Sequence, residues 1–273
     1  MSIVERPIRL RYAATCSSCG AALAPGTRAV WRRVERVAIC DRCVGGERTQ
    51  PAEIDRGTPG GSARREWQRR HDRREQHILT EHRHLGRLLV ALSDDPQSTT
   101  AWGIGAEGER ELGESLNRLR RDGIAVVHDR RIPGSSANID HIAIGHAGVF
   151  VIDTKRYRGR VESRDVGGWL TSDLQLFVAG RNRSKLLAGM ARQAEAVRRS
   201  LAGTPESASV PVTPVIVFVS DDNWSLFSRP LRFGDVHVVW GKKLGEMIRA
   251  RGPVDTTTIM RLEEAITRAL PAA

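Results

Sequence analysis

The chain has 273 residues, a length that allows one large hydrophobic core and a small appended module. Hydrophobic residues make up 40% and charged residues 27%, which is ordinary for a soluble globular protein. The longest apolar run, VIVFVS near residue 215, is too short to span a bilayer, and no apolar segment follows the N-terminus. We therefore expect neither a signal peptide nor a membrane anchor, and we expect a cytoplasmic protein.

The formal net charge of +11 is concentrated in the N-terminal third of the chain. Residues 1–50 hold nine Arg against four acidic residues, and residues 62–92 hold eight Arg against four. A basic surplus of this kind suits a polyanion such as nucleic acid, although a solvated Arg-rich surface explains it equally well. Only four of the 43 basic residues are Lys.

All four cysteines lie within residues 1–48, a segment too short to build much core of its own. They form two Cys-x2-Cys pairs separated by 20 residues, the spacing of a four-thiolate zinc site. Two redox dithiols or disulfides are the alternative, but a reducing compartment and the paired spacing favour a closed, structural site that folds around its metal. We expect a zinc-ribbon-like module over 1–48, with zinc ligands Cys16, Cys19, Cys40 and Cys43.

Residues 49–100 are predicted to form a linker and an Arg-rich helix. The Gly/Pro-rich stretch DRGTPGGS precedes a helix from about Ala63 to Leu92, and the polar loop SDDPQSTT follows it. The Arg side chains would contact phosphates without reading bases. Alternatively, apolar side chains dock the helix on the next domain and leave the Arg solvated; these are Trp67, Leu85, Leu88 and Leu89. We expect docking with some phosphate contact.

Four histidines of this helix do not share one face, so we expect them on the surface and not at a metal; they are His71, His77, His82 and His84.

From Ala101 onward, helical and strand patterns alternate. We expect helices at about 106–121, 184–202, 242–250 and 256–269, and strands at about 124–128, 138–144, 149–155, 213–219 and 235–240. This order predicts an α/β (α+β) domain over 101–273, in which helices flank a mixed sheet.

The stretch NIDHIAIGHAGVFVIDTK, residues 138–155, predicts two strands joined by the turn GHAG. A symmetric hairpin places Ile144 opposite Val149 and Asp140 opposite Asp153, with both acids on one face of the sheet. Opposed like charges destabilise a hairpin, so we interpret the pair as ligands of a divalent cation. Oxygen ligands favour Mg²⁺ or Mn²⁺. The alternative is an exposed hairpin whose acids pair with nearby Lys or Arg.

Lys155 supports the metal interpretation because it lies two residues after Asp153, hence on the same face. A Lys ammonium is a compact charge whose pKa can shift, unlike that of the Arg that this chain uses almost everywhere else.

Two more polar residues point inward from predicted helices. Glu109 falls within or beside the apolar stripe of Leu112 and Leu116, and a shared metal site would explain an inward acid. Gln193 lies on the stripe of Met190 and Val197; a core-edge Gln bonded to backbone is an equally good explanation there.

Together these residues resemble the PD-(D/E)xK nuclease superfamily in the ordered set Glu109, Asp140, Asp153-Thr154-Lys155 and Gln193. The segments GAEGE and NIDHIAIGHAGVFVIDTKRYRG, followed by Trp169, are more closely similar to the NERD (nuclease-related) domain over about residues 103–215. The resemblance implies a restriction-endonuclease-like sheet. Asp153 stands where this family more often has Glu, and its shorter side chain should shift the metal slightly.

The resemblance also implies roles for these residues in phosphodiester hydrolysis. The two hairpin aspartates and the backbone carbonyl of Thr154 would bind Mg²⁺, and Glu109 would bind metal directly, through water, or help to hold a second ion. Lys155 would orient and acidify the attacking water, and Gln193 would support the site. Metal coordination generates hydroxide near neutral pH and stabilises charge on the phosphate.

Three functions are compatible with the sequence. The intact set of acids and Lys favours a Mg²⁺-dependent nuclease acting on nucleic acid, with DNA as the expected substrate. A non-catalytic nucleic-acid-binding or adaptor protein could keep the same fold, and a metal-dependent hydrolase of another phosphate ester is a weaker third interpretation.

Overall fold

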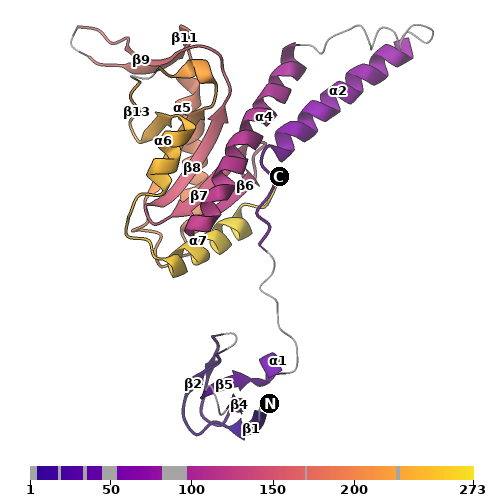
Figure 1. The fold of residues 1–273 in the computed structure, drawn as a ribbon, viewed down its shortest axis with the longest axis vertical. Helices are drawn as coiled ribbons and strands as arrows, with labels where there is room; N and C mark the ends of the chain where they lie inside the picture. Colours follow the sequence, from indigo (N-terminus) through magenta and orange to yellow (C-terminus); the bar gives the residue numbers. More distant parts are fainter. Residues whose placement is uncertain are drawn as a thin grey trace. The chain divides into compact units, whose positions relative to one another are not determined.

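The structure of the chain is a computed structural model (Figure 1). It describes residues 5–17, 20–32, 36–44, 54–81, 97–169, 171–225 and 228–273. The chain divides into two compact units, Met1–Ile54 and Asp55–Ala273. The domain boundaries expected after residues 48 and 100 stay predictions. Within the described ranges, no helix is both long and apolar enough to cross a bilayer.

The first unit is a small β-structure. Strands β1 (Glu5–Arg9), β4 (Arg28–Arg32) and β5 (Val37–Cys40) form an antiparallel sheet in the order β1-β4-β5. Strands β2 (Ala14–Thr15) and β3 (Ala22–Leu23) form a second, two-stranded pair, and the short helix α1 (Asp41–Val44) follows β5. Two of the cysteines, Cys16 and Cys40, belong to its small buried cluster.

The second unit is built on a six-stranded mixed sheet in the order β13-β14-β12-β8-β7-β6. Its strands are β6 (Ala125–Arg131), β7 (Asn138–Gly145), β8 (Gly148–Lys155), β12 (Val212–Phe218), β13 (Leu231–Phe233) and β14 (Val236–Val239). Strand β12 pairs in parallel with β8 and β14, and the other neighbours are antiparallel. The expected mixed sheet is confirmed.

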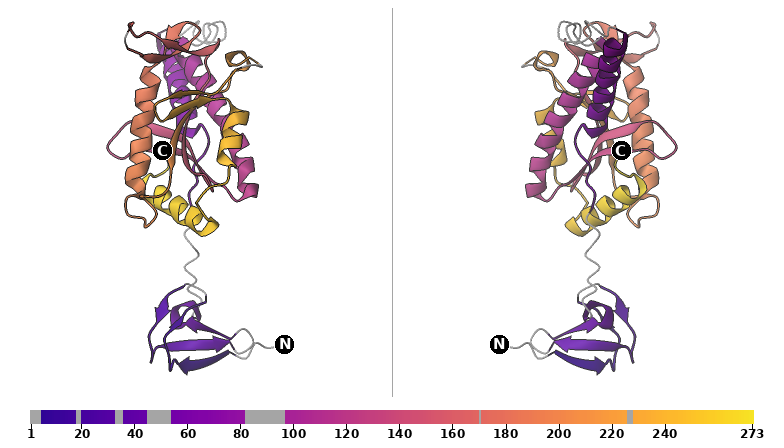
Figure 2. Two further views of the ribbon diagram at one scale, coloured as in Figure 1. Left: turned by 90° about the vertical axis from the view of Figure 1, so that its left-hand side faces the viewer. Right: turned by 90° about the vertical axis from the view of Figure 1, so that its right-hand side faces the viewer.

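Helices cover both faces of this sheet (Figures 1 and 2). On one face, α4 (Gln97–Arg118) and α6 (Gly241–Ile248) contribute Leu112 and Leu244 to a core with Phe150 and Ile152. On the other, α5 (Lys185–Leu201) and α7 (Thr256–Ala269) pack on the opposite side chains of the same strands. Strands β7 and β8 are apolar on both faces because both are covered. The expected arrangement of helices flanking the sheet is therefore confirmed.

Helix α2 (Gly61–Glu81) packs against α4. Gly103 of α4 makes room for the indole of Trp67, because a Cβ on this glycine would lie 3.3 Å from the ring. Gly113 of α4 likewise lets Pro59 come close to the helix, because a Cβ on this glycine would lie 2.4 Å from the side chain of Pro59. Trp67 therefore packs α2 against α4. This agrees with the interpretation that apolar side chains dock this helix on the following domain.

Parts of the predicted Arg-rich helix fall outside the described residues, namely Leu85, Leu88, Leu89, His82 and His84. His77 is exposed, and His71 stacks on Trp67 with a ring separation of 5.5 Å.

One boundary prediction is wrong. Residues 97–100, expected in a polar loop, are helical, and α4 begins nine residues before the predicted start at 106. Gly103 and Gly105 lower helix propensity in this turn, but packing of α2 on this part of α4 favours the helix.

A small antiparallel sheet was not anticipated from the pattern. It consists of β9 (Val161–Asp165), β10 (Leu174–Val178) and β11 (Arg181–Asn182), in the order β11-β10-β9. Its inner residues Val161, Leu176 and Val178 are buried in the larger of the two core clusters, so the base of this sheet belongs to the second unit.

Candidate active site

The β7–β8 hairpin has the register that its sequence predicts. Ile144 pairs with Val149, and the ladder runs to the pair His141 and Ile152. The next residues along the two strands are Asp140 and Asp153, and they share the face covered by α5. The hairpin thus directs both carboxylates toward one side of the sheet.

Asp140 is half-buried and accepts a hydrogen bond from the backbone N–H of Thr154, with an Oδ2–N distance of 2.7 Å. Burial, and then repulsion from Asp153, raise the pKa of Asp140 to about 7, although Lys155 and the Thr154 N–H oppose the shift. A carboxylate in this position is costly unless a cation is close.

Lys155 supplies a cation at this point. Its Nζ lies 2.7 Å from Oδ2 of Asp153 and 3.1 Å from the backbone oxygen of Thr154. Burial lowers the pKa of Lys155, but attraction to Asp153 and Asp140 outweighs burial, and the net pKa is raised. The ammonium therefore stays charged and stands among the oxygen atoms expected to bind a divalent ion.

Glu109 and Gln193 reach the same region from two helices. Gln193 of α5 donates a hydrogen bond from Nε2 to Oδ1 of Asp153 at 3.3 Å. The alternative explanation, a Gln at the edge of the core that bonds to backbone, is therefore wrong. Glu109 of α4 is half-buried, and burial followed by repulsion from Asp140 raises its pKa to about 9. Helix α4 thus adds a third acid to the two of the hairpin.

The donor set fits a hard cation, because three carboxylates and the Thr154 carbonyl offer only oxygen. Among the described residues, the three carboxylates do not form a group with all ligand oxygens within 4.8 Å of one another. An ion bound directly by all three would draw them closer, whereas Glu109 acting through water would not need to move. The buried Oε1 of Gln193 has no hydrogen-bond partner in the described part of the chain, which leaves an acceptor available to water.

Two buried imidazoles, those of His128 and His141, lie outside the set of candidate residues. His141 lies on the face opposite to Asp140, and its Nδ1 is 2.9 Å from Nδ1 of His128 on β6. The Nε2 of His128 lies 3.0 Å from Oδ1 of Asn117 on α4. Alternation alone placed His141, but its partner could not be found without the β6–β7 register. These rings support α4, which carries Glu109.

Asp129 is a further buried polar residue that the sequence pattern does not indicate. Its carboxylate is buried and accepts hydrogen bonds from the N–H and the hydroxyl of Ser62, both at 2.6 Å, so it caps the start of α2. The Nδ1 of His146 bonds the backbone oxygen of Val254 at 2.6 Å.

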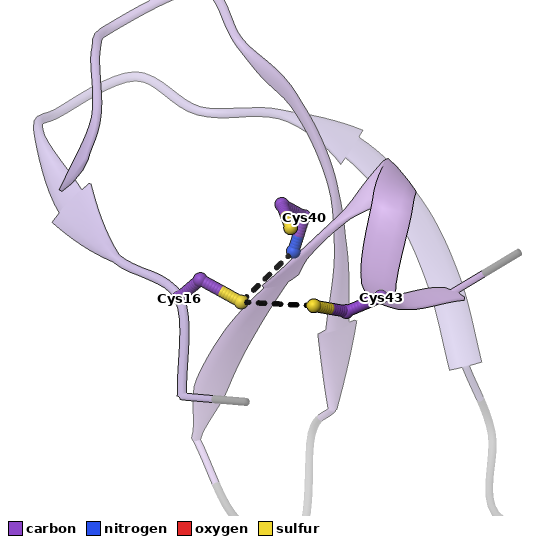
Figure 3. A group of neighbouring side chains, drawn as sticks. All are labelled: Cys16, Cys40 and Cys43. Carbon is purple, nitrogen blue, oxygen red and sulfur yellow. Dashed lines mark hydrogen bonds between the residues drawn. The ribbon is translucent and has the colours of Figure 1, made fainter. Parts of the chain in front are cut away.

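Three of the cysteines, Cys16, Cys40 and Cys43, gather in the first unit (Figure 3). The sulfurs of Cys16, Cys40 and Cys43 lie within 4.8 Å of one another, and those of Cys16 and Cys43 are 3.9 Å apart. Tetrahedral zinc with sulfurs at about 2.3 Å requires a sulfur–sulfur distance of about 3.8 Å. The cluster is therefore compatible with a metal site, and Cys19 lies outside the described residues.

Comparison with known proteins identifies part of the second unit. Residues 104–219 match the family model of the nuclease-related domain, NERD. No curated protein and no solved structure matches the chain. The matched segment covers a little under half of the chain and contains all five candidate residues, Glu109, Asp140, Asp153, Lys155 and Gln193.

Proposed function

Because residues 104–219 form a nuclease-related domain, we propose that this chain is a Mg²⁺- or Mn²⁺-dependent nuclease that hydrolyses phosphodiester bonds by means of an activated water. The observation that carries this proposal is the convergence of Lys155 and Gln193 on Asp153, beside a second aspartate with a raised pKa. Perturbed pKa values combined with a specific charge partner are typical of functional sites.

In the proposed reaction the two hairpin aspartates and the Thr154 carbonyl would hold the ion, and Glu109 would bind it through a water. A bound divalent ion would lower the pKa of water and stabilise charge on the phosphate. Lys155, whose ammonium lies beside these oxygens, would orient and acidify the attacking water. Gln193 keeps Asp153 oriented through its hydrogen bond.

The proposed substrate is nucleic acid, and DNA is the form we favour. Support comes from the net charge of +11, with its surplus in the N-terminal third, and from the six arginines of α2. We also propose that the cluster of Cys16, Cys40 and Cys43 binds a structural zinc ion, with Cys19 as the fourth ligand. The cytoplasmic location stays a prediction.

A cleavage assay with Mg²⁺ tests the proposed activity. Plasmid DNA and single-stranded DNA are incubated with wild type, Asp140→Ala and Lys155→Ala, and products are resolved on gels. We expect each substitution to lower the rate by about 100-fold or more, because each removes a group acting at the reacting phosphate. Lys243→Ala is the matched control: it removes a lysine that forms an ion pair with Glu246 far from these residues in sequence.

Two outcomes would overturn the proposal. Cleavage that survives both active-site substitutions would show that another site is responsible. Tight nucleic-acid binding by wild type without cleavage, in Mg²⁺ and in Mn²⁺, would instead identify a non-catalytic binding protein. Thermal melting of each variant verifies that loss of activity is not loss of folding.

A further inference from the structure

The β9–β10 hairpin leaves the candidate active site directly. Strand β8 ends at Lys155, and β9 begins at Val161, six residues later. Figure 1 shows the hairpin projecting past the end of the central sheet. At about 3.3 Å per residue, the five residues of β9 reach about 13 Å outward.

The hairpin carries apolar side chains at its outer end. Trp169 is 99% exposed, and Val166 and Leu174 are about half exposed. Leu174 continues the inward-facing row of Leu176 and Val178, but it lies beyond the edge of the core. Single exposed apolar residues are ordinary, whereas three at the outer end of one hairpin, including a fully exposed indole, indicate a binding surface.

The described residues on both sides of Trp169 are tied together by hydrogen bonds to Asp165. Asp165 accepts bonds from the N–H groups of Gly167 and Asp173, at 2.9 and 2.8 Å, and from the hydroxyl of Ser172 at 2.7 Å. A loop fixed in this way presents the indole without a large ordering cost on binding.

The base of the hairpin is equally fixed. The side-chain amide of Asn223 donates to the backbone oxygens of Tyr157 and Gly159, at 2.6 and 2.7 Å, and Asn223 itself is buried. The N–H of Gly159 donates to Asp222 at 2.7 Å. The hairpin is thus a rigid extension of the strand that carries Asp153 and Lys155.

Three exposed arginines surround this base: Arg158, Arg160 and Arg181, here called the base arginines. The backbone oxygen of Arg160 accepts from Ala179 next to the β10–β11 turn, so Arg160 lies near Arg181. Among the described residues none of the three forms an ion pair, in contrast to Arg164, which pairs with Glu162. Residues 156–185 carry seven basic and three acidic side chains. This charge suits phosphates.

We propose that the β9–β10 hairpin is a substrate-binding arm, in which the base arginines contact phosphates and Trp169 stacks on a base of a single-stranded segment. Stacking requires an exposed base face, which a single strand offers and the interior of a duplex does not. This inference rests on the proposed nuclease function. It names single-stranded nucleic acid as the form of substrate that the arm holds.

Binding is measured by fluorescence anisotropy in buffer without added divalent metal, so that no cleavage is needed. The probes are a labelled oligothymidylate and a labelled duplex of the same length. We expect Trp169→Ala to weaken single-strand binding roughly 5- to 150-fold, the range for loss of one base–aromatic stack, and to change duplex binding less than twofold. Trp169→Phe should retain most of the affinity. The control Met260→Ala removes another exposed apolar side chain, on α7, and should have no effect.

Salt dependence separates the two parts of the arm. Trp169→Ala should leave the slope of log affinity against log salt unchanged, because the indole releases no counterions. Arg160→Gln should reduce this slope by about 0.7, the value for one phosphate contact on a single strand. Equal single-strand affinity of wild type and Trp169→Ala would overturn the proposal, as would an absence of wild-type binding at low salt.

The outcomes also separate this inference from the proposed function. Cleavage by wild type together with unchanged binding by Trp169→Ala would refute the arm and leave the nuclease proposal standing. Trp169-dependent binding without any cleavage would refute the nuclease and support the arm.

Discussion

Asp140 occupies an unfavourable position for a carboxylate in the metal-free protein. It is half-buried, it lies across from Asp153, and its pKa is raised to about 7 by burial and by that neighbour. Lys155 offsets part of this repulsion through its ion pair with Asp153. Strain of this kind is expected where stability has been given up for binding a cation.

Replacing Asp140 by Asn should therefore separate stability from activity. Asn keeps an oxygen that can accept from the Thr154 N–H but removes the charge. We expect Asp140→Asn to raise the free energy of unfolding by about 1 kcal/mol at neutral pH without divalent metal, and to abolish cleavage. Urea denaturation measures the stability change, and the cleavage assay measures the activity.

Added Mg²⁺ provides the control for this variant. It should stabilise wild type and not Asp140→Asn, because a ligand that binds only the folded state stabilises it. A variant less stable than wild type in the absence of metal would contradict the view that Asp140 is held at a cost.

Strand alternation predicted that Asp140, Asp153 and Lys155 would share a face, because a hairpin leaves only one parity once its turn is known. The local contacts within that face could not be predicted. The hydrogen bond from the Thr154 N–H to Asp140 depends on where the strand ends. The hydrogen bond from the Gln193 amide to Asp153 depends on the placement of α5. Neither leaves a sequence signal.

At the level of elements, long apolar patterns were predictable and short polar ones were not. Strands β7, β8 and β12 could be predicted from the sequence because both faces of each strand are buried and therefore apolar. Strand β9, VESRD, has one apolar residue, and its pairing with β10 stabilises it only in the folded chain. The start of α4 was not predicted because Gly103 and Gly105 lower helix propensity there, and the packing of Trp67 on Gly103 leaves no sequence signal.

The buried imidazole pair joins β6, β7 and α4 and should make stability depend on pH. Burial, and then the charges of Arg120 and Arg130, lower the pKa of His128 to about 3; burial and then His128 lower that of His141. Unfolded histidines bind protons near pH 6.5, so the unfolded state gains protons first as pH falls. The stabilisation present above about pH 6.5 is lost progressively toward the folded pKa, by up to about 1.4 kcal/mol per pH unit and per histidine.

Urea denaturation between neutral and mildly acidic pH measures this dependence. His128→Gln removes one of the two titrating rings and should make the fall in unfolding free energy shallower below about pH 6.5. Comparison with wild type at neutral pH gives the cost of the substitution itself. An unchanged slope in the variant would mean that the pair is not held neutral in the folded state.

For the whole molecule, the distribution of residues between the two units has a functional consequence. All four cysteines lie in Met1–Ile54, whereas every candidate catalytic residue lies in Asp55–Ala273. In the described part of the first unit the buried cluster is small, and Cys16 and Cys40 themselves take part in it. Its folding should therefore depend on its metal, and that of the second unit should not.

Zinc removal tests this division, because thiol reactivity in this chain reports on the first unit alone. With zinc bound, a thiol reagent should react slowly; after treatment with a strong chelator, all four thiols should react and about one equivalent of zinc should be released. The second unit should keep its thermal transition, and cleavage of a short oligonucleotide should recover when Mg²⁺ alone is restored. Cys43→Ser, which removes one sulfur from the cluster, should show the reactive state without chelator.

Thiols that react equally fast before and after chelation would contradict a structural zinc site. Loss of cleavage that Mg²⁺ cannot restore would mean that the first unit takes part in catalysis and does more than bind substrate.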